Sequence, residues 1–337
     1  MTRMEPTASL ELAVREAAGE RLDKFVSQLM PHISRSRIQR AIETGEITVH
    51  GSLERASYRL RRGDVVRVEI GPETEVETDI VPDDIPLDIL YEDEDLIVLN
   101  KQTGLIVHPA PGISRGTLVN GLVAHCPAMK STGVIGRPGL VHRLDKDTTG
   151  VIVVAKSESA HMELSEQIRL RQVDKTYHAV CYGLPDPSEG VINAPIGRHP
   201  VDRKKMAVIE ESRRGRHALS RYRTLETYPG MALLEVDIET GRTHQIRVHL
   251  NHIGHSVVGD PQYGRGKARP SEIQSRDWDS GVGDVVERIP GQALHAYRLT
   301  FRHPTSEEIM TFEAPWKDHF KELVEALREL TRELGPA

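Results

Sequence analysis

The chain has 337 residues, enough for more than one domain with its own hydrophobic core. Charged residues make up 28% of it, and no apolar run approaches the length of a membrane-spanning helix. We therefore expect a cytoplasmic protein with no membrane partner and no secretory leader. The two cysteines, Cys126 and Cys181, lack CxxC spacing and are too few for a disulfide framework, which suits a reducing compartment.

Charge is distributed unevenly along the chain. The net charge is −6, yet residues 21–67 contain ten Lys or Arg against five Asp or Glu, whereas residues 69–95 contain twelve acids and no Lys or Arg. Within the acidic stretch, residues 73–86 include prolines and are expected to form an extended linker, because like charges repel. Charge distribution matters more than net charge for binding a polyanion, so the segment before the linker is a candidate basic module.

The first predicted elements alternate between two kinds of periodicity. Residues 1–17 lack a packing pattern and are expected to form a loose tail. Residues 21–30 carry apolar side chains at helical spacing, and a second helix is predicted over residues 34–45, between a serine that can cap it and a glycine that can end it. From residue 47 onward the apolar period changes to two, which predicts short strands. Residues 18–72 are thus expected to form a small α/β domain.

Three arginines lie on the second predicted helix: Arg35, Arg37 and Arg40. The sequences SRSRIQRAIETGEITVHG and LRRGDVVRV, which begin at residues 34 and 60, resemble the S4 RNA-binding domain. The resemblance implies that this helix and the loop after it bind RNA. Clustered arginines bind phosphates with salt-sensitive, sequence-tolerant affinity. The alternative is a solvated helix face that binds nothing, which is the commoner meaning of a charged run.

A larger domain is predicted over residues 87–337. Its predicted strands include residues 96–99, 151–154, 175–182, 220–225 and 233–238, and its predicted helices start at Thr117 and Ser157 and close the chain over residues 316–334. Residues 265–290 are polar and rich in glycine and are predicted to form a long surface insertion. Because strands and helices do not alternate regularly, we expect an α+β fold with a mostly antiparallel mixed sheet.

The candidate for chemistry lies in the middle of the chain. Residues 139–150 read GLVHRLDKDTTG and place Asp145 between two predicted strands. Taken alone, this aspartate also fits a turn residue that binds backbone amides. The stretch resembles the central motif of the RluA/RluD-type pseudouridine synthases. The resemblance continues, in the order found in that family, through KTY at 175–177, GRTHQIRVH at 241–249 and QALHAYRLTFRHP at 292–304.

This resemblance implies an isomerase that converts uridine to pseudouridine. The expected partner is large-subunit (23S) ribosomal RNA or its assembling particle, with transfer RNA an open alternative. The reaction breaks the bond from N1 to C1′, turns the uracil and rejoins it through C5, so no redox step is needed. The sequence contains neither a Walker loop nor a dinucleotide fingerprint, and we expect no cofactor. We expect a monomer.

The resemblance also assigns roles within the site. It makes Asp145 the nucleophile, Arg247 its basic partner, Tyr177 the residue that stacks on the base and takes a proton late, and Ile246 a wall of the pocket. A carboxylate in a closed pocket needs a cation to stay charged, and a guanidinium can also fix its orientation. If Thr243 caps a helix, helical spacing puts Arg247 at the edge of the buried stripe, with its head free to enter a pocket.

Reaching the uridine requires that it leave its stack, at a cost of a few kcal/mol. The resemblance implies that Arg143 enters the RNA where the flipped base was. In a strand this side chain shares the face of Asp145, and a guanidinium can both stack and pair with phosphate. The neighbouring His142 is expected to be an RNA contact as well.

Two other classes of function compete with the enzyme hypothesis. One is a non-catalytic S4-type ribosome assembly factor, against which the joint presence of Asp145, Tyr177 and Arg247 argues. The other is a metal-dependent hydrolase built on four histidines within twelve residues, at 244, 249, 252 and 255. These histidines lack HExxH spacing, so no metal site is predicted.

Overall fold

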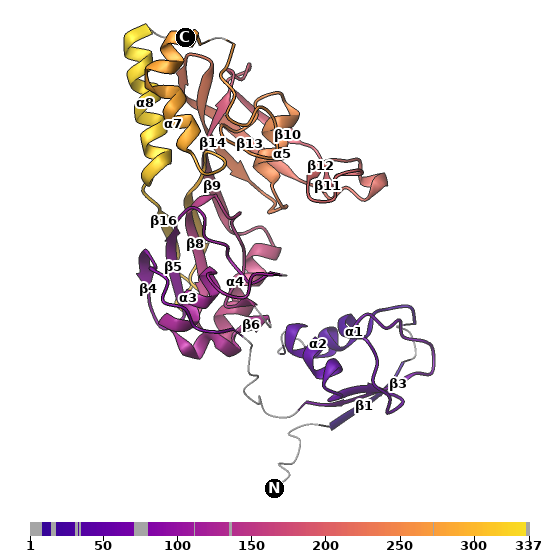
Figure 1. Ribbon diagram of the computed structural model, residues 1–337. Helices are drawn as coiled ribbons and strands as arrows, with labels where there is room; N and C mark the ends of the chain where they lie inside the picture. The colour runs from indigo at the N-terminus through magenta and orange to yellow at the C-terminus, as the bar shows by residue number, and fades with distance from the viewer. Residues whose placement is uncertain are drawn as a thin grey trace.

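The computed structural model describes residues 9–14, 18–30, 33, 35–70, 80–110, 112–134, 137–271 and 273–334. Figure 1 shows a small domain at the N-terminal end and a larger domain built on a long twisted sheet. The small domain contains three strands and two helices: β1 (Ser9–Ala13), α1 (Leu22–Leu29), α2 (Arg35–Glu43), β2 (Ile47–Val49) and β3 (Val65–Glu69).

The small domain confirms the predicted order of two helices followed by strands. Its antiparallel sheet has the order β1-β3-β2. Both helices bury their apolar stripes against this sheet, and the core includes Val26, Ile38 and Ile42. The predicted cap, Ser34, lies outside the described residues.

The prediction of a loose tail over residues 1–17 is wrong for residues 9–13. They form β1, which pairs with β3 along its whole length, from Ser9 opposite Glu69 to Ala13 opposite Val65. Five residues with two leucines are too few to predict a strand with confidence from sequence. The strand forms because β3 offers it an unpaired edge, and the backbone hydrogen bonds gained there do not depend on side chains.

The larger domain contains a sheet of nine strands within the described residues. They are β4 (Ile89–Glu92), β5 (Leu96–Lys101), β8 (Thr149–Ala155), β9 (Asp174–Tyr182), β10 (Glu189–Asn193), β13 (Leu219–Tyr228), β14 (Met231–Ile238), β15 (Leu294–Arg302) and β16 (Ile309–Glu313). Their order is β10-β13-β14-β9-β15-β8-β5-β4, and β16 pairs with β15. Every pair is antiparallel except β15 with β8. This confirms the predicted α+β fold.

Shorter strands and the helices complete the domain. The helices are α3 (Leu118–His125), η1 (Pro127–Ser131), α4 (Glu158–Arg169), η2 (Glu211–Arg213), α5 (Gln245–His252), α6 (Ser275–Asp277), η3 (Trp278–Val282), α7 (Gly283–Arg288) and α8 (Asp318–Leu334), and the two strand pairs are β6 (Gly133–Val134) with β7 (Arg137–Pro138) and β11 (Ile196–Arg198) with β12 (Met206–Val208). Ser157 caps α4 as predicted, accepting a hydrogen bond from the Ala160 amide at 3.2 Å. The predicted closing helix, α8, buries Phe320, Leu323 and Leu327.

The prediction that residues 265–290 form a surface insertion is wrong. This segment folds into α6, η3 and α7, and Ile273, Val286 and Ile289 join the main hydrophobic core. Figure 1 shows α7 alongside α8. The sequence of this segment is mostly polar, but its few apolar side chains are buried. Short helices are stable when such side chains pack against the rest of the protein.

Two glycines fix the ends of the central motif. Gly139 and Gly150 have φ of +67° and +108°, and a Cβ on Gly150 would stand 2.2 Å from the carbonyl oxygen of Ala296. Only glycine fits such a conformation and so close an approach. The second glycine lets β8 pair in parallel with β15 at Ala296. Residues 141–148 therefore lie outside the named strands, between Leu140, which bridges Val154 of β8, and the start of β8.

His295 makes the fold sensitive to acid. It is fully buried in β15; its Nδ1 lies 2.8 Å from the Thr149 hydroxyl and its Nε2 lies 2.9 Å from the Ala314 carbonyl oxygen. Burial lowers the pKa of His295 to about 4. The unfolded chain therefore binds this proton from about pH 6.5 downward while the folded chain does not, so stability is lost as pH falls from about 6.5 to about 4.

We expect the buried, neutral His295 to lower the free energy of unfolding by about 2 kcal/mol when the pH falls from 7 to 5. Urea unfolding of the wild type and of His295→Gln at both pH values measures this difference. The variant, which cannot titrate in this range, is expected to lose about 2 kcal/mol less than the wild type over the interval. Equal losses in the two proteins would contradict the prediction.

Candidate active site

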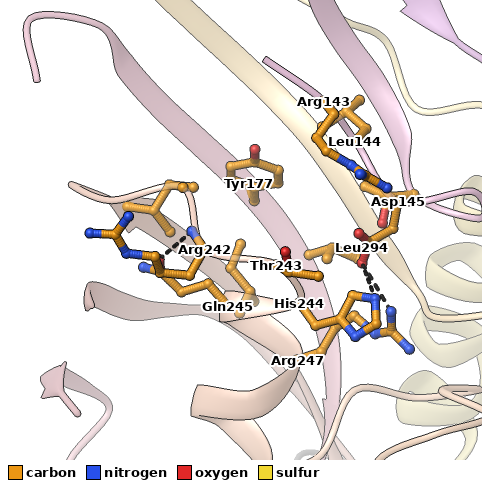
Figure 2. A pocket seen from close by; sticks show the side chains of 14 residues that line it. Arg143, Leu144, Asp145, Tyr177, Arg242, Thr243, His244, Gln245, Arg247 and Leu294 are labelled. Atoms are coloured by element: carbon orange, nitrogen blue, oxygen red, sulfur yellow. Dashed lines mark hydrogen bonds and ion pairs between the residues drawn. The ribbon is translucent and has the colours of Figure 1, made fainter. Parts of the chain in front are cut away.

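The central motif, β9 and the start of α5 enclose a cavity (Figure 2). It is lined by Arg143, Leu144, Asp145, Thr148, Tyr177, Ile238, Gly241, Arg242, Thr243, His244, Gln245, Ile246, Arg247 and Leu294. Five of the six catalytic-domain residues singled out in the sequence therefore meet at one place, although they come from three separate motifs. A second cavity adjoins the first at Asp145 and Arg247.

The motifs are also bonded to one another. The amide of Gln292 donates to the Thr148 hydroxyl at 2.8 Å, and Thr149 bonds to His295. The two threonines of the central motif are thus held by the QALHA segment. These bonds fix the loop that carries Asp145 at the edge where β8 and β15 meet.

Asp145 is bound on one side only. Arg247 Nη1 donates to its Oδ2 at 2.9 Å, and His244 Nε2 lies 3.8 Å from the same oxygen. Among the described residues, no donor reaches Oδ1. The side chain is 19% exposed, and Figure 2 shows it facing the cavity. One carboxylate oxygen is therefore held while the other is open to a bound molecule.

Arg247 is oriented by a second carboxylate, which sequence reasoning did not assign to the site. Asp260 is fully buried and accepts from Arg247 Nε at 2.6 Å and from Nη2 at 2.8 Å. Its Oδ1 also accepts from the backbone amides of Gln262 and Tyr263. A bidentate pair of this kind fixes the plane of the guanidinium, which leaves Nη1 directed at Asp145.

Arg247 stays protonated in the folded protein. Burial opposes it, but the hydrogen bond and charge of Asp260, together with the charge of Asp145, outweigh burial and raise the pKa of Arg247 above its ordinary value. A guanidinium that stays charged attracts a neighbouring carboxylate as well as hydrogen-bonding to it. The guanidinium also lies 5.1 Å from the ring centre of Tyr263, a cation–π distance.

Tyr177 and Ile246 both line the cavity. Tyr177 lies in β9 and is almost fully buried, and its hydroxyl makes no hydrogen bond with the described residues. Burial, and secondly the charge of Asp145, raise the pKa of Tyr177. Ile246, Leu144 and Leu294 add apolar surface beside it. The space between ring and side chains is suited to a flat, uncharged group.

The start of α5 differs from the prediction. Thr243 does not cap the helix; His244 precedes it, with a left-handed φ of +57°. The helix start is held instead by Gln245, whose Oε1 accepts from the Arg242 amide at 3.1 Å and from the Thr240 hydroxyl at 2.7 Å. A non-glycine residue in this conformation costs about 1–3 kcal/mol and is typical of functional sites. It aims the His244 ring at Asp145.

Lys101 is a buried cation that the sequence did not single out. Its Nζ donates to the carbonyl oxygens of Gln102, Leu105 and Lys146 at 2.8–2.9 Å. Burial lowers the pKa of Lys101 to about 7, and the charges of Asp147 and Asp145 act in the opposite direction. Because it binds the backbone directly after Asp145, Lys101 ties the reactive loop to β5.

Arg143 and His142, two and three residues before Asp145, point to different environments. Arg143 is exposed, lines both cavities and makes no hydrogen bond or ion pair with any described residue. His142 instead accepts a hydrogen bond from the Val153 amide at 3.1 Å, and burial lowers the pKa of His142 to about 3. The side chain of His142 is therefore engaged with β8, and this geometry does not support the predicted RNA contact.

The arginines of α2 do not form a uniformly exposed face of the helix. Arg37 is 9% exposed and donates to both oxygens of Glu46, at 3.1 and 2.5 Å. Arg40 is 8% exposed, and its Nε has no hydrogen-bond partner among the described residues. The side chain of Arg35 lies outside the described residues. Arg37 is therefore paired with the glutamate three residues past the helix, and its contact with phosphate stays a prediction.

The histidines of the 244–255 segment take part in separate contacts. His249 is buried between the Ser220 hydroxyl and the Ala194 carbonyl oxygen, and His255 lies 3.0 Å from the Tyr182 carbonyl oxygen. Across the described parts of the chain, no three His, Cys, Asp or Glu side chains are arranged to hold a metal ion. No helix in those parts is long and apolar enough to span a membrane.

Comparison with known proteins gives matches for both domains. Residues 95–252 match the profile of the RNA pseudouridylate synthase family, and residues 20–66 match the S4 domain. The chain is 45% identical to an uncharacterized RNA pseudouridine synthase of Synechocystis sp., over 92% of this chain and 90% of the relative. It is 42% identical to the ribosomal large subunit pseudouridine synthase D of Nitrosomonas europaea, over 96% and 89%.

Solved structures show the same likeness. The human RNA pseudouridylate synthase domain-containing 4 protein is 29% identical and superposes with a TM-score of 0.56, over 72% of this chain and 93% of the human chain. These similarities include both domains and span nearly the full length of the sequence relatives. The chain therefore belongs to the RluA/RluD-type RNA pseudouridine synthases, isomerases that convert uridine in RNA to pseudouridine, and carries an S4 domain ahead of its catalytic domain.

Proposed function

We propose that this enzyme isomerises uridines in large-subunit ribosomal RNA, with Asp145 as the nucleophile and with the target nucleotide flipped into the cavity. The observation that carries the proposal is the one-sided binding of Asp145. Arg247 holds Oδ2 at 2.9 Å, while no donor among the described residues reaches Oδ1, and Asp145 lines the cavity together with Tyr177. A carboxylate that adds to a nucleotide and leaves again needs both a stable charge and one unblocked oxygen.

The isomerisation leaves the composition of the nucleotide unchanged, although one hydrogen is exchanged with solvent. The N1–C1′ bond breaks while Asp145 is bound to the nucleotide, the uracil turns, and C5 bonds to C1′. The C5 hydrogen is then released as a proton, N1 gains a proton, and Asp145 leaves as a carboxylate. This scheme needs one nucleophile and no electron acceptor, which agrees with a site built from Asp145, Arg247 and apolar walls.

The cavity walls supply the surfaces that a flipped uracil requires. Bases are held in proteins by stacking on aromatic or apolar side chains, and Tyr177 and Ile246, which both line the cavity, offer such surfaces. The raised pKa of Tyr177 keeps its hydroxyl protonated. We therefore assign stacking as its main role; accepting the C5 proton would require the hydroxyl to pass on its own proton.

Arg143 is suited to replacing the flipped base in the RNA. It is exposed at the mouth of both cavities, two residues before Asp145, and binds no other described group. Because flipping costs a few kcal/mol, a guanidinium that stacks in the vacated space offsets part of this cost.

Ribosomal RNA is supported as the substrate by the relatives. Proteins named ribosomal large subunit pseudouridine synthase D share 42% identity with this chain over more than nine-tenths of its length. The S4 domain supplies a second region for RNA binding. In this proposal the enzyme acts as a monomer in the cytoplasm, where the large subunit is assembled.

The test is tritium release from C5-labelled uridine in a transcript of large-subunit ribosomal RNA, without added cofactor. We expect the wild type to release tritium and the modified positions to map to defined uridines. Release from transfer RNA transcripts alone would overturn the ribosomal assignment. Absence of release from transcripts, assembling particles and transfer RNA would overturn the proposed activity.

A further inference from the structure

His244 is an active-site residue whose ring is hydrogen-bonded through one nitrogen only. The side chain is 17% exposed and lines both of the cavities that meet at Asp145. Figure 2 shows the ring beside Asp145, and its Nε2 lies 3.8 Å from Asp145 Oδ2, which is too far for a hydrogen bond. No acceptor in the described part of the chain is bonded to Nε2. This nitrogen is therefore available to a molecule in the cavity.

The other ring nitrogen, Nδ1, is bound by Tyr263. The Tyr263 hydroxyl lies 2.8 Å from Nδ1 and accepts a hydrogen bond from the Met206 amide at 2.9 Å. Burial raises the pKa of Tyr263, so the hydroxyl keeps its single proton. If Nδ1 also carried a proton, the hydroxyl of this 7% exposed side chain would have no acceptor among the described residues. The Tyr263 hydroxyl therefore donates to Nδ1.

This hydrogen bond fixes the tautomer of His244. Burial lowers the pKa of His244, so the ring is neutral at neutral pH and carries one proton. Because Nδ1 accepts a hydrogen bond, that proton is on Nε2. The backbone also orients the ring, since His244 has the left-handed φ of +57°. His244 therefore presents a neutral N–H donor to the cavity.

We propose that His244 Nε2 donates a hydrogen bond to the O2 carbonyl of the flipped uracil and stabilises the charge that the base gains when the N1–C1′ bond breaks. The inference rests on the proposed function and adds a catalytic residue to it. The electron pair of the broken bond leaves with the uracil, is shared by N1 and the carbonyl oxygens, and returns to the ribose when C5 bonds to C1′. His244 keeps its proton throughout. A fixed donor directed at a developing charge binds the transition state more strongly than the ground state.

The position of O2 in the uracil ring favours it over O4 as the acceptor. O2 is attached to the carbon next to N1, whereas O4 lies across the ring from N1. A nucleotide whose C1′ reaches the Asp145 carboxylate therefore brings O2 close to that carboxylate, where His244 Nε2 lies. The guanidinium of Arg247 is already bonded to Asp145 and Asp260. His244 can thus bind O2 without breaking a hydrogen bond of the protein.

The first test compares His244→Leu with His244→Gln in the full chain. Both variants lack the imidazole and place a long side chain at the same φ, but only glutamine has a terminal amide that can donate. We expect His244→Leu to lower the single-turnover rate on the large-subunit transcript about 100-fold, as for loss of one donor to a developing charge, and His244→Gln to lower it about tenfold or less. The affinity for RNA is expected to match the wild type. Equal rate losses in the two variants would overturn the role as a donor.

The second test locates the acceptor with thio-substituted transcripts, read as isomerised nucleoside after nuclease digestion. Sulfur accepts hydrogen bonds weakly, so 2-thiouridine removes the proposed acceptor and 4-thiouridine is the matched control. We expect the ratio of wild-type to His244→Leu rates to stay at about 100 on uridine and 4-thiouridine and to fall to about 10 or less on 2-thiouridine. The same ratio on all three substrates would mean that His244 acts through Asp145 or the fold, and would overturn the proposal. A fall confined to 4-thiouridine would also overturn it.

The tautomer is measured without RNA, by nitrogen-15 NMR of the histidine rings. The signals of His244 are identified by their absence in His244→Gln. We expect a protonated Nε2 and an unprotonated Nδ1, and we expect Tyr263→Phe to shift part of the proton population to Nδ1. A wild-type proton on Nδ1 in an active enzyme would overturn this inference alone. A wild type that isomerises no RNA would instead overturn the proposed function, and the role of His244 with it, even if Nε2 is protonated.

Discussion

Asp145→Asn is expected to abolish turnover while leaving the fold and the affinity for RNA intact. The amide keeps the shape of the side chain and can still accept a hydrogen bond from Arg247 Nη1, but it lacks the charge that makes a nucleophile. Loss of an enzyme's nucleophile costs several orders of magnitude, so we expect tritium release to fall about 10⁴-fold or more. Urea unfolding and RNA binding are expected to match the wild type within experimental error.

The matched control is Asp147→Asn, the same chemical change two residues away in the same loop. Asp147 packs against Gly291 rather than beside Arg247. We expect it to retain activity within about tenfold, because it changes the electrostatics of the loop without removing the reacting group. Comparable losses in both variants would show that loop charge, and not a nucleophile at Asp145, controls turnover.

The sequence predicts a helix or strand correctly where the periodicity of its apolar residues matches the face that the element buries. The apolar period of residues 151–154 predicted the centre of β8, and the stripe at Phe320, Leu323 and Leu327 predicted α8. The meeting of Asp145 with Arg247 was available only through the resemblance of their motifs. No periodicity relates two residues that are 102 positions apart.

The features that were missed depend on contacts between distant segments. Asp260 is one more acid in the sequence, and its role arises because a turn brings it to Arg247. The signal that was present is the cluster of turn-forming residues around it, in GDPQYG at 259–264. The ion pair of Arg37 could not be predicted for a related reason. Helical spacing gives the direction of a side chain, but it does not reveal that Glu46 lies within hydrogen-bond distance of it.

The second large effect is expected from Arg247→Met, on stability as well as on activity. The substitution leaves the fully buried carboxylate of Asp260 without its cation. Breaking a buried pair by removing one partner costs about 3–5 kcal/mol, and we expect a loss of this size in the unfolding free energy measured by urea. Tritium release is expected to fall as well, because Asp145 loses the donor that orients it.

Adding Asp260→Asn to Arg247→Met separates the two roles of the arginine. The neutral amide removes the unpaired buried charge, so the double variant is expected to recover most of the lost stability. It does not restore a donor to Asp145, so activity is expected to stay low. Asp260→Asn alone keeps Arg247 but weakens the bonds that fix its plane, and we expect kcat to fall more than affinity for RNA changes. Recovery of activity along with stability in the double variant would mean that Arg247 acts on the fold alone, because the guanidinium would then be dispensable once its buried partner is neutral.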